Sequence, residues 1–333
     1  MSNLSIKALH SALLRWYQAN GRHSLPWRNQ AIQNRPYVVL VSEIMLQQTQ
    51  VKVVLERYFF PFLEKFPTLK ALSLAKEEEV LRAWQGLGYY ARARNLQKLS
   101  QLCANTGLPK EVKDLIKLPG IGAYTAGAIA CFGYDLSVSF VDSNIKRILT
   151  RLFALKSPTQ KQLEQQAKAI LNLQDSFNHN QALIDLGALI CTAKSPKCEI
   201  CPLQTFCKGK NILEQLTQNK SNRNSKKTLY YAISIKEDKI ALVKSTQKLY
   251  FNLYNFPEIS QKDSTRLKNI GILKHAYTKY NLSVHCHFCD NPTILTQNLE
   301  FFTPQQLTTI PLSSLALKIL KLLKTKGIFD SNF

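Results

Sequence analysis

Four cysteine side chains lie close enough in the sequence to bind one small inorganic centre. They are Cys191, Cys198, Cys201 and Cys207 in the run CTAKSPKCEICPLQTFC, a C-x6-C-x2-C-x5-C spacing. Thiolates at such short spacing, in a chain without a secretory signal, suit iron–sulfur or zinc chemistry better than a disulfide framework. Zinc sites usually show two similar knuckles, whereas here a single C-x2-C stands between two unequal gaps. The spacing leaves the metal open but favours a 4Fe-4S cluster.

The cysteine run is also rich in positive charge, because Lys194, Lys197, Lys208 and Lys210 lie in or beside it. These side chains would present the loop to an anion. A cluster that holds the loop in shape is compatible with this interpretation.

A glycine-containing turn, LPGIG at 118–122, follows one helical segment and precedes another, AYTAGAIACF, that is rich in small residues. We interpret it as a helix-hairpin-helix turn. Gly120 and Gly122 would let the backbone approach closely, and the first N–H groups of the second helix would point at a phosphate. An ordinary glycine turn is the alternative. Further on, Asp142 in VDSN lies at or just before the start of another helix, where it is either a plain N-cap or a functional carboxylate.

The composition points to a polyanionic partner. Of 333 residues, 44 are Lys or Arg and 22 are Asp or Glu, which gives a net charge of +22. Nucleic acid is the first expectation and a membrane surface the second. No apolar stretch approaches the roughly 20 residues that span a bilayer, and the N-terminus MSNLSIKALH lacks a signal-peptide core. We therefore expect no membrane partner and a cytoplasmic location.

The elements that must position these residues divide the chain into three parts. Residues 1–207 show apolar residues at helical spacing and predict an all-helical domain. Residues 208–228 form a basic, polar stretch that we interpret as a linker. Residues 229–333 carry short β-like runs, such as LYYAISI and LSVHCHF, and close on the amphipathic segment LSSLALKILKLLKTK. The predicted fold is mainly α, followed by a smaller α+β domain.

The string VHCHFC contains His285, Cys286, His287 and Cys289, which resemble one pair of ligands of a zinc site. Alternation of side chains along one strand explains the string as well, and no second pair of ligands is evident. We therefore expect no metal there.

The turn, the aspartate and the cysteine run follow one another in the order found in the endonuclease III superfamily of DNA glycosylases, and the chain resembles its MutY-type adenine DNA glycosylases. The resembling strings are LPWR at 25–28, SEIMLQQTQV at 42–51, GLGYYARARNL at 86–96, LPGIGAYTAGAIA at 118–130, VDSNIKR at 141–147, ALIDLGALIC at 182–191 and the cysteine run. The resemblance implies a helix-hairpin-helix glycosylase with a 4Fe-4S cluster and a Nudix-like C-terminal domain. It implies a monomer that acts on double-stranded DNA with A opposite 8-oxoguanine or G, in base excision repair.

The chemistry of adenine removal requires an acid and a carboxylate. Adenine leaves readily only when a ring nitrogen is protonated, and the sugar passes through an oxocarbenium-like state. Glu43 lies in the apolar segment YVVLVSEIMLQQ, where burial would raise its pKa and keep it protonated. The resemblance assigns it the acid role. Asp142 would stay ionised at its helix N-terminus and stabilise the sugar electrostatically or through a transient covalent bond.

Tyr124 separates the two nearest functions. Relatives of the endonuclease III type carry at this position a lysine that cleaves the strand through a Schiff base, so a tyrosine predicts a monofunctional glycosylase with Asn144 beside Asp142. An endonuclease III-like glycosylase/lyase acting on oxidised pyrimidines, or a non-catalytic iron–sulfur DNA-binding protein, are the alternatives. The family usually has glycine where this chain has Ser143, which a helix start tolerates.

The resemblance also implies DNA contacts, since a base must be extruded before it can be removed. Gln47, one turn after Glu43, and Tyr89 would enter the stack beside the opposite base. Other positions match those that surround the extruded adenine or hold nearby backbone: Leu25, Trp27, Arg28 and Gln181. Where the family reads 8-oxoguanine with Phe-Ser-His, this chain has Tyr277-Thr278-Lys279, so the aromatic and hydroxyl contacts are kept and the imidazole is lost. Nothing between Pro257 and Gly271 resembles a Nudix glutamate-rich helix, so we expect no nucleotide hydrolysis.

Overall fold

The computed structural model describes residues 3–213, 225–247, 250–277, 280–292, 295 and 298–329. The chain forms two compact units. The first comprises Met1–Ser73 and Lys98–Asn219, and the second comprises Leu74–Gln97 and Lys220–Phe333.

The described part of the first unit is helical, as the sequence predicts. Its helices are α1 (Asn3–Asn20), α2 (Arg35–Leu46), α3 (Val51–Arg57), α4 (Phe59–Lys65), α5 (Leu69–Leu74), α8 (Val112–Leu115), α9 (Ala123–Ala128), α10 (Ser143–Leu152), α11 (Gln160–Ala169) and α12 (Ser176–Leu189). Two helices begin in the second unit's segment of the chain, α6 (Glu77–Ala83) and α7 (Ala91–Cys103).

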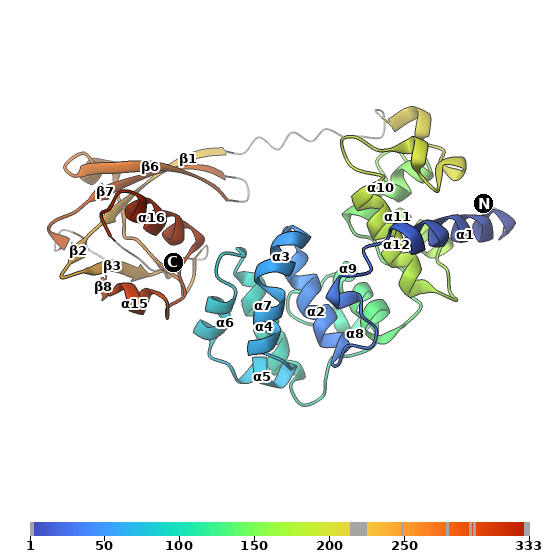
Figure 1. Ribbon diagram of the computed structural model, residues 1–333, viewed down its shortest axis with the longest axis horizontal. Coiled ribbons are helices and arrows are strands. Elements are labelled where there is room, and N and C mark those ends of the chain that lie inside the picture. Colours follow the sequence, from blue (N-terminus) through green and yellow to red (C-terminus); the bar gives the residue numbers. More distant parts are fainter. Residues whose placement is uncertain are drawn as a thin grey trace. The chain divides into compact units, whose positions relative to one another are not determined.

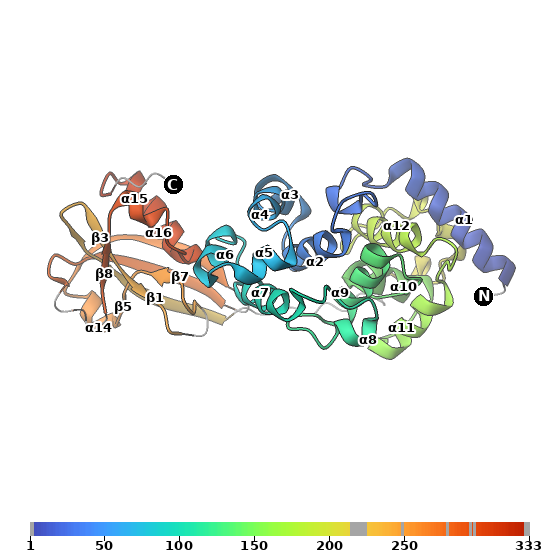
Figure 2. The ribbon, with the colours of Figure 1, turned by 90° about the horizontal axis from the view of Figure 1, so that it is seen from below.

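Helix α2 forms the centre of this unit because it is apolar on almost every side. A proline stands in its first turn, where the missing N–H costs nothing. Residues from Tyr37 to Met45 are all buried, which is typical of a helix surrounded by others. In contrast, α10 has one apolar face, with Ile145, Ile148 and Leu149 buried. Helix α12 packs against both α1 and α10 (Figure 2).

The predicted helix-hairpin-helix turn joins α8 to α9. Gly120 has φ +77°, a left-handed conformation that favours glycine, and Gly122 is the N-cap of α9. After Ala128 the helix widens into a π turn, Ile129–Gly133. Gly127 lets α9 lie directly on Phe140, since a Cβ at this position would lie only 2.6 Å from the Cβ of Phe140.

The described C-terminal region is α+β. Its strands are β1 (Ser225–Ile233), β2 (Ile235–Lys236), β3 (Lys239–Lys244), β4 (Tyr254–Asn255), β5 (Glu258–Ile259), β6 (Lys268–Tyr277), β7 (Tyr280–Phe288) and β8 (Glu300–Phe302), with the short helices α14 (Gln261–Ser264) and α15 (Pro304–Leu307). One sheet has the order β5-β1-β7-β6, with β1 and β7 parallel and β6 and β7 an antiparallel hairpin. The other has the order β2-β3-β4, with β8 on β3.

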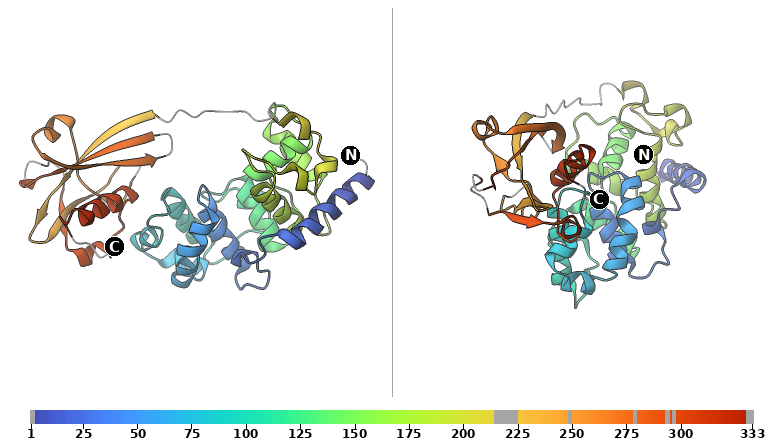
Figure 3. Two further views of the ribbon diagram at one scale, coloured as in Figure 1. Left: turned by 45° about the horizontal axis from the view of Figure 1, so that its top comes forward. Right: turned by 60° about the vertical axis from the view of Figure 1, so that its left-hand side comes forward.

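The predicted closing helix is α16 (Ser314–Thr325), which lies along one face of the β1-β7-β6 sheet (Figures 1 and 3). Gly271 of β6 allows this approach, because a Cβ there would already lie 3.3 Å from a methyl of Leu322. Leu315, Ile319 and Leu323 of the helix are fully buried. The sheet and this helix therefore share one apolar core.

The string VHCHFC lies on β7 except for Cys289, which directly follows the strand, and along β7 side chains alternate between the two faces. The rings of His285 and His287 stack with centroids 6.4 Å apart. Cys286 lies between them in sequence and is fully buried on the opposite face. The strand therefore separates the imidazoles from the Cys286 thiol.

The three-part domain division remains a prediction, but the structure groups some residues differently. Strand β1 begins at Ser225, so four residues assigned to the linker lie in a strand. Residues 214–224 of that linker lie outside the described residues. Residues 74–97, assigned to the helical domain, are part of the second compact unit. Among the helices described, none combines the length and the apolar character needed to cross a membrane.

Candidate active site

A cleft of about 750 Å³ opens in the first unit between the end of α2, the start of α9 and the start of α10. Most of the predicted site residues line it: Leu25, Trp27, Arg28, Glu43, Gln47, Tyr124, Asp142, Asn144 and Gln181. The fold thus brings together side chains from five separate stretches of sequence. This volume is in the range of pockets that enclose a small organic ligand.

Other predicted residues lie elsewhere. Gly120 and Gly122 form the turn before α9. Tyr89 belongs to the second unit. Tyr277 is the last residue of β6, and Thr278 lies outside the described residues.

Glu43 is buried in the floor of the cleft, with 7% of its surface exposed. Burial raises its pKa from the ordinary 4.5 to about 7. The Tyr124 hydroxyl donates a hydrogen bond of 2.5 Å to Oε2 of Glu43 and opposes this rise, whereas the charge of Asp142 adds to it. A large share of Glu43 is therefore protonated near neutral pH, as a general acid requires.

Asp142 is the N-cap of α10, as the sequence predicts. One carboxyl oxygen accepts the N–H of Ile145 at 2.6 Å, and the other accepts the side-chain amide of Asn144 at 2.9 Å. Burial raises the pKa of Asp142 above its ordinary value, while these hydrogen bonds and the charge of Arg147 oppose the rise. Both oxygens face N–H donors, which bind the ionised form of a carboxylate.

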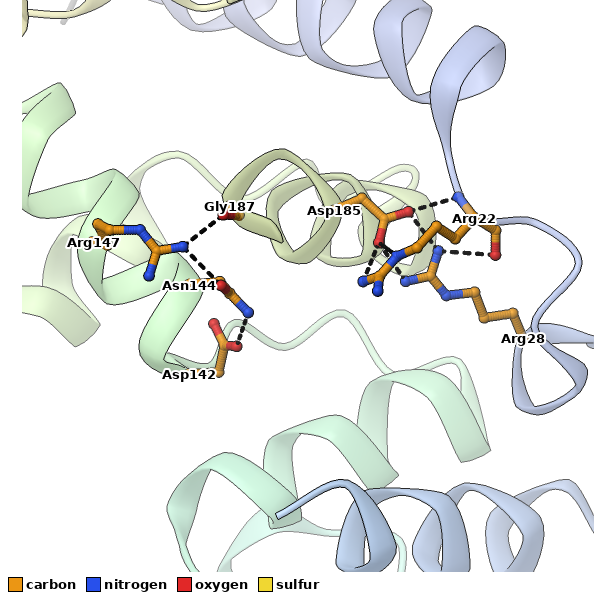
Figure 4. A network of polar contacts seen from close by, with 7 residues as sticks. All are labelled: Arg22, Arg28, Asp142, Asn144, Arg147, Asp185 and Gly187. Carbon is orange, nitrogen blue, oxygen red and sulfur yellow. Dashed lines mark hydrogen bonds and ion pairs between the residues drawn. The ribbon is translucent and has the colours of Figure 1, made fainter. Parts of the chain in front are cut away.

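Arg147 links Asn144, which binds Asp142, to the backbone of Gly187 (Figure 4), and it also reaches the backbone of Cys191 in the cysteine run. Its Nη2 donates to Oδ1 of Asn144 at 2.8 Å and to the carbonyl of Gly187 at 2.6 Å, and its Nε donates to the carbonyl of Cys191 at 2.6 Å. Gly187 is required for this contact, since a Cβ there would lie 2.5 Å from the Cβ of Asn144. Arg147 was not among the predicted site residues, although its spacing of three residues from Asn144 places both on one face of a helix.

A second polar network lies on the other side of the cleft (Figure 4). Arg28 donates two hydrogen bonds to the fully buried carboxylate of Asp185, at 2.7 and 2.8 Å. Arg22 adds its backbone N–H at 2.8 Å and its Nε at 2.7 Å. Burial alone would raise the pKa of Asp185, but the two arginines outweigh burial and lower it. Arg28 was predicted to hold the base or nearby backbone, and its guanidinium is in fact held by Asp185, which sequence reasoning missed.

Leu25 and Trp27 add apolar surface to the cleft from the short 3-10 helix Pro26–Arg28 and the N-cap before it. The Trp27 ring packs edge-on against Phe59 of α4, with centroids 5.1 Å apart. One prediction needs correction here. Gln47 was placed one turn after Glu43 on the same helix, but α2 ends at Leu46 and Gln47 is its C-cap, with φ −59° and ψ 110° outside the helical region. It still lines the cleft because the chain turns there into residues 48–50.

The four cysteines of the run surround one small pocket, together with Arg151 and Ile190. None of these four cysteines forms a disulfide bond. Nη1 of Arg151 lies 3.3 Å from the sulfur of Cys191 and donates to the carbonyl of Thr192 at 2.7 Å. In the part of the chain that the structure describes, no three His, Cys, Asp or Glu side chains converge tightly enough for a single metal ion. Four sulfurs around a shared space, beside a cation, fit an anionic iron–sulfur cluster.

Comparison with known proteins agrees with this geometry. Residues 41–172 match the model of the HhH-GPD superfamily base excision DNA repair protein, and residues 191–207 match the iron–sulfur binding domain of endonuclease III. The adenine DNA glycosylase of Buchnera aphidicola subsp. Baizongia pistaciae is 36% identical over 315 residues, 88% of each chain. The adenine DNA glycosylase of Mycolicibacterium smegmatis is 42% identical over 197 residues, 57% of this chain and 66% of that one. The solved structure of a thermostable thymine-DNA glycosylase superposes with a TM-score of 0.57 at 27% identity, over 62% of this chain and 97% of that one.

The helical fold, the glycine-containing hairpin, the cleft with two carboxyl groups and the cysteine loop thus define a DNA glycosylase of the HhH-GPD superfamily. Its cofactor is an iron–sulfur cluster bound by Cys191, Cys198, Cys201 and Cys207. Within the superfamily, the chain belongs to the adenine DNA glycosylase family, because its similarity to those enzymes extends over most of its length.

The Arg147 network leads to a first prediction. Replacing Arg147 with lysine keeps the positive charge but removes the planar guanidinium group, whose N–H donors bind Asn144, Gly187 and Cys191 at the same time. We expect the single-turnover rate of base release to fall by about 10²-fold, the effect of misplacing a catalytic group by about 1 Å. Iron content and the visible absorbance of the cluster should be measured on the same samples.

The matched control is Arg15→Lys, which changes an exposed arginine on α1. It should release adenine at the unaltered rate. If Arg147→Lys released the base at the unaltered rate with normal iron content, Asp142 and Asn144 would keep their geometry without the guanidinium group.

Proposed function

We propose that the chain removes adenine paired with 8-oxoguanine or G from duplex DNA, by hydrolysis of the N-glycosidic bond at the start of base excision repair. One observation carries this proposal: two carboxyl groups share the cleft but have different surroundings. Glu43 is buried with a pKa of about 7, and Asp142 is held between N–H donors at a helix N-terminus. Pairs of carboxyl groups in such contrasting environments divide acid and anion roles between them.

The reaction follows from these two roles. An adenine extruded into the cleft takes the proton of Glu43 on a ring nitrogen, and the glycosidic bond breaks with its electron pair leaving on the base. The ionised Asp142 stabilises the positive charge left on the sugar, electrostatically or through a transient covalent bond. Water then attacks the sugar carbon and gives its proton to the carboxylate of Glu43, which restores the acid.

Tyr124 supports a reaction that stops after base removal. Its hydroxyl lies 2.5 Å from Oε2 of Glu43, in the position where lyase relatives carry a lysine. A phenol whose pKa burial raises well above its usual range stays protonated and offers no amine for a Schiff base. The product is therefore an intact strand with an abasic site.

The remaining predicted residues are assigned to DNA. Gln47 and Tyr89 fill the space left by the extruded base, and the turn at Gly120 and Gly122 binds a phosphate through backbone N–H groups. Leu25, Trp27 and Gln181 enclose the adenine. Tyr277, the last residue of β6, and Thr278, which follows it in sequence, contact the 8-oxoguanine.

A panel of duplexes tests this function. The chain should release adenine opposite 8-oxoguanine and opposite G but leave adenine opposite T, and strands should break only after alkali. Release of thymine glycol with cleavage before alkali would instead favour an endonuclease III-like lyase. Binding without release from any duplex would leave a non-catalytic DNA-binding protein.

A further inference from the structure

The turn that follows α6 holds Tyr89 in an unusual backbone conformation. Gly86, Gly88 and Tyr89 all have positive φ, at +90°, +77° and +50°. The indole N–H of Trp84 donates to the carbonyl of Gly88 at 3.1 Å, and Nη2 of Arg92 donates to the same carbonyl at 3.1 Å. The Arg92 guanidinium also lies over the Tyr89 ring, 5.5 Å from its centre. The direction of the Tyr89 side chain therefore depends on the shape of this turn.

A second set of contacts joins the turn to a residue more than two hundred positions later. The Tyr90 hydroxyl, in a side chain only 4% exposed, donates to the carbonyl of Leu312 at 3.1 Å and accepts the N–H of Gly86 at 3.3 Å. The N–H of Leu312 donates to Oε1 of Gln85 at 2.9 Å. Leu312 is fully buried. Side chains of the turn thus form hydrogen bonds with both the N–H and the carbonyl of Leu312. Without these bonds the two buried polar groups would be unpaired, which costs free energy.

Leu312 is itself bonded into the C-terminal strands. The N–H of Tyr254 donates to the carbonyl of Pro311 at 2.9 Å, and the N–H of Ser313 donates to the carbonyl of Tyr254 at 3.0 Å. This forms a parallel bridge between Leu312 and β4, which in turn pairs with β3. A continuous hydrogen-bonded path therefore runs from the sheet to the turn.

Other contacts near this path are more exposed to water and stabilise the turn less. Lys244 pairs with Glu78 at 2.7 Å, the side-chain amide of Asn252 donates to Glu77 at 3.0 Å, and Arg94 donates to the carbonyl of Phe251 at 2.9 Å. Exposed ion pairs contribute little because water screens them. The buried bonds of Gln85 and Tyr90 are therefore the specific part of the contact.

We propose that residues 311–313 brace the turn that carries Tyr89, with Gln85 and Tyr90 as positioning residues, so that the C-terminal region controls insertion of Tyr89 into DNA. The role of Tyr89 rests on the proposed function, whereas the brace is a property of the free protein. The C-terminal region then has a task besides contact with the opposite base. Loosening the brace should slow base extrusion opposite G as well as opposite 8-oxoguanine.

Two variants of the full chain test the brace. Gln85→Leu removes the acceptor for the Leu312 N–H, and Tyr90→Phe removes the hydroxyl alone. In each, amide hydrogen exchange in residues 84–92 of the free protein should become about fivefold faster, the effect of one hydrogen bond. Extrusion of 2-aminopurine placed opposite G and opposite 8-oxoguanine, followed by its fluorescence, should slow by a similar factor.

Matched variants separate the brace from general loss of stability. Tyr37→Phe also removes a buried tyrosine-to-carbonyl bond, 2.7 Å to Phe66, but in the first unit. It should leave exchange in residues 84–92 and extrusion unchanged, and Gln85→Glu, which keeps an acceptor oxygen, should behave like the unaltered chain.

Unchanged exchange in residues 84–92 in both Gln85→Leu and Tyr90→Phe would overturn the brace, and so would equal acceleration in Tyr37→Phe. Because exchange is measured without DNA, this result is independent of the proposed function. Failure of the unaltered chain to release adenine would overturn that function and leave the exchange result standing.

Discussion

Adenine release is expected to become undetectable when Asp142 is replaced with asparagine, with a loss of about 10³-fold or more in single-turnover rate, the upper range for one electrostatic group at a reacting centre. The substitution keeps the size of the side chain but removes the negative charge that faces the sugar cation. Duplex binding should change by less than about twofold, because the lost interaction belongs to the transition state. Rate and binding are measured on the same A opposite 8-oxoguanine duplex.

The cap position limits the structural change in this variant. Asparagine caps helices as well as aspartate does, so α10 and the hydrogen bond to Ile145 are expected to persist, whereas the bond from the side-chain amide of Asn144 is lost together with the second carboxyl oxygen. Asp175 provides the matched control, since it caps α12 by accepting the N–H of Asn178 at 3.2 Å and does not line the cleft. Asp175→Asn should retain full activity. A turnover near the unaltered rate in Asp142→Asn would remove the aspartate from the mechanism.

The features that the sequence predicted well are local ones. The spacing of the four cysteines, the glycines of LPGIG and the capping position of Asp142 each depend on residues within a few positions of one another, so their geometry follows from backbone rules. Glu43 was predictable for a similar reason, since apolar neighbours on all sides of a helix imply burial.

The partners of the site residues could not be predicted in this way. Arg28 and Asp185 are 157 positions apart, and Arg147 meets Gly187 across 40 positions. The sequence around each of these residues does not indicate which distant residue is its partner. A contact between a side chain and a distant backbone group is harder still to predict. Gln85 and Tyr90 bind the N–H and the carbonyl of Leu312, and every residue type except proline offers the same two groups.

The strands of the C-terminal region illustrate the same limit. Alternation of apolar residues predicted runs that became β1, β3 and β7, and an apolar face predicted α16. The pairing of β1 with β7 in parallel was not predicted, since it joins segments that are far apart in the sequence, with β2 to β6 between them. Which strands pair, and in which register, depends on which apolar faces are buried in the same core. A single sequence does not show this.

The pH dependence of base release provides the second large effect. In the proposed mechanism Glu43 acts in its protonated form, and burial raises its pKa to about 7. Above that pH the protonated fraction falls about tenfold per unit, so kcat/KM should decline with a slope of −1. Below it, Asp142 must be ionised, and burial raises its pKa above the ordinary value. The expected profile is a bell whose alkaline limb belongs to Glu43 and whose acid limb belongs to Asp142.

Substitutions identify the alkaline limb. Glu43→Gln should reduce the rate by about 10²–10⁴-fold, the contribution of a general acid, and should abolish the decline above pH 7. Tyr124→Phe should move that decline to higher pH, because the lost hydrogen bond from the hydroxyl is one that lowers the pKa of Glu43. An alkaline limb that persists in Glu43→Gln would mean that another group donates the proton. A limb that moves to lower pH in Tyr124→Phe would mean that the phenol stabilises the protonated carboxyl, and the acid role would then belong to Glu43 and Tyr124 together.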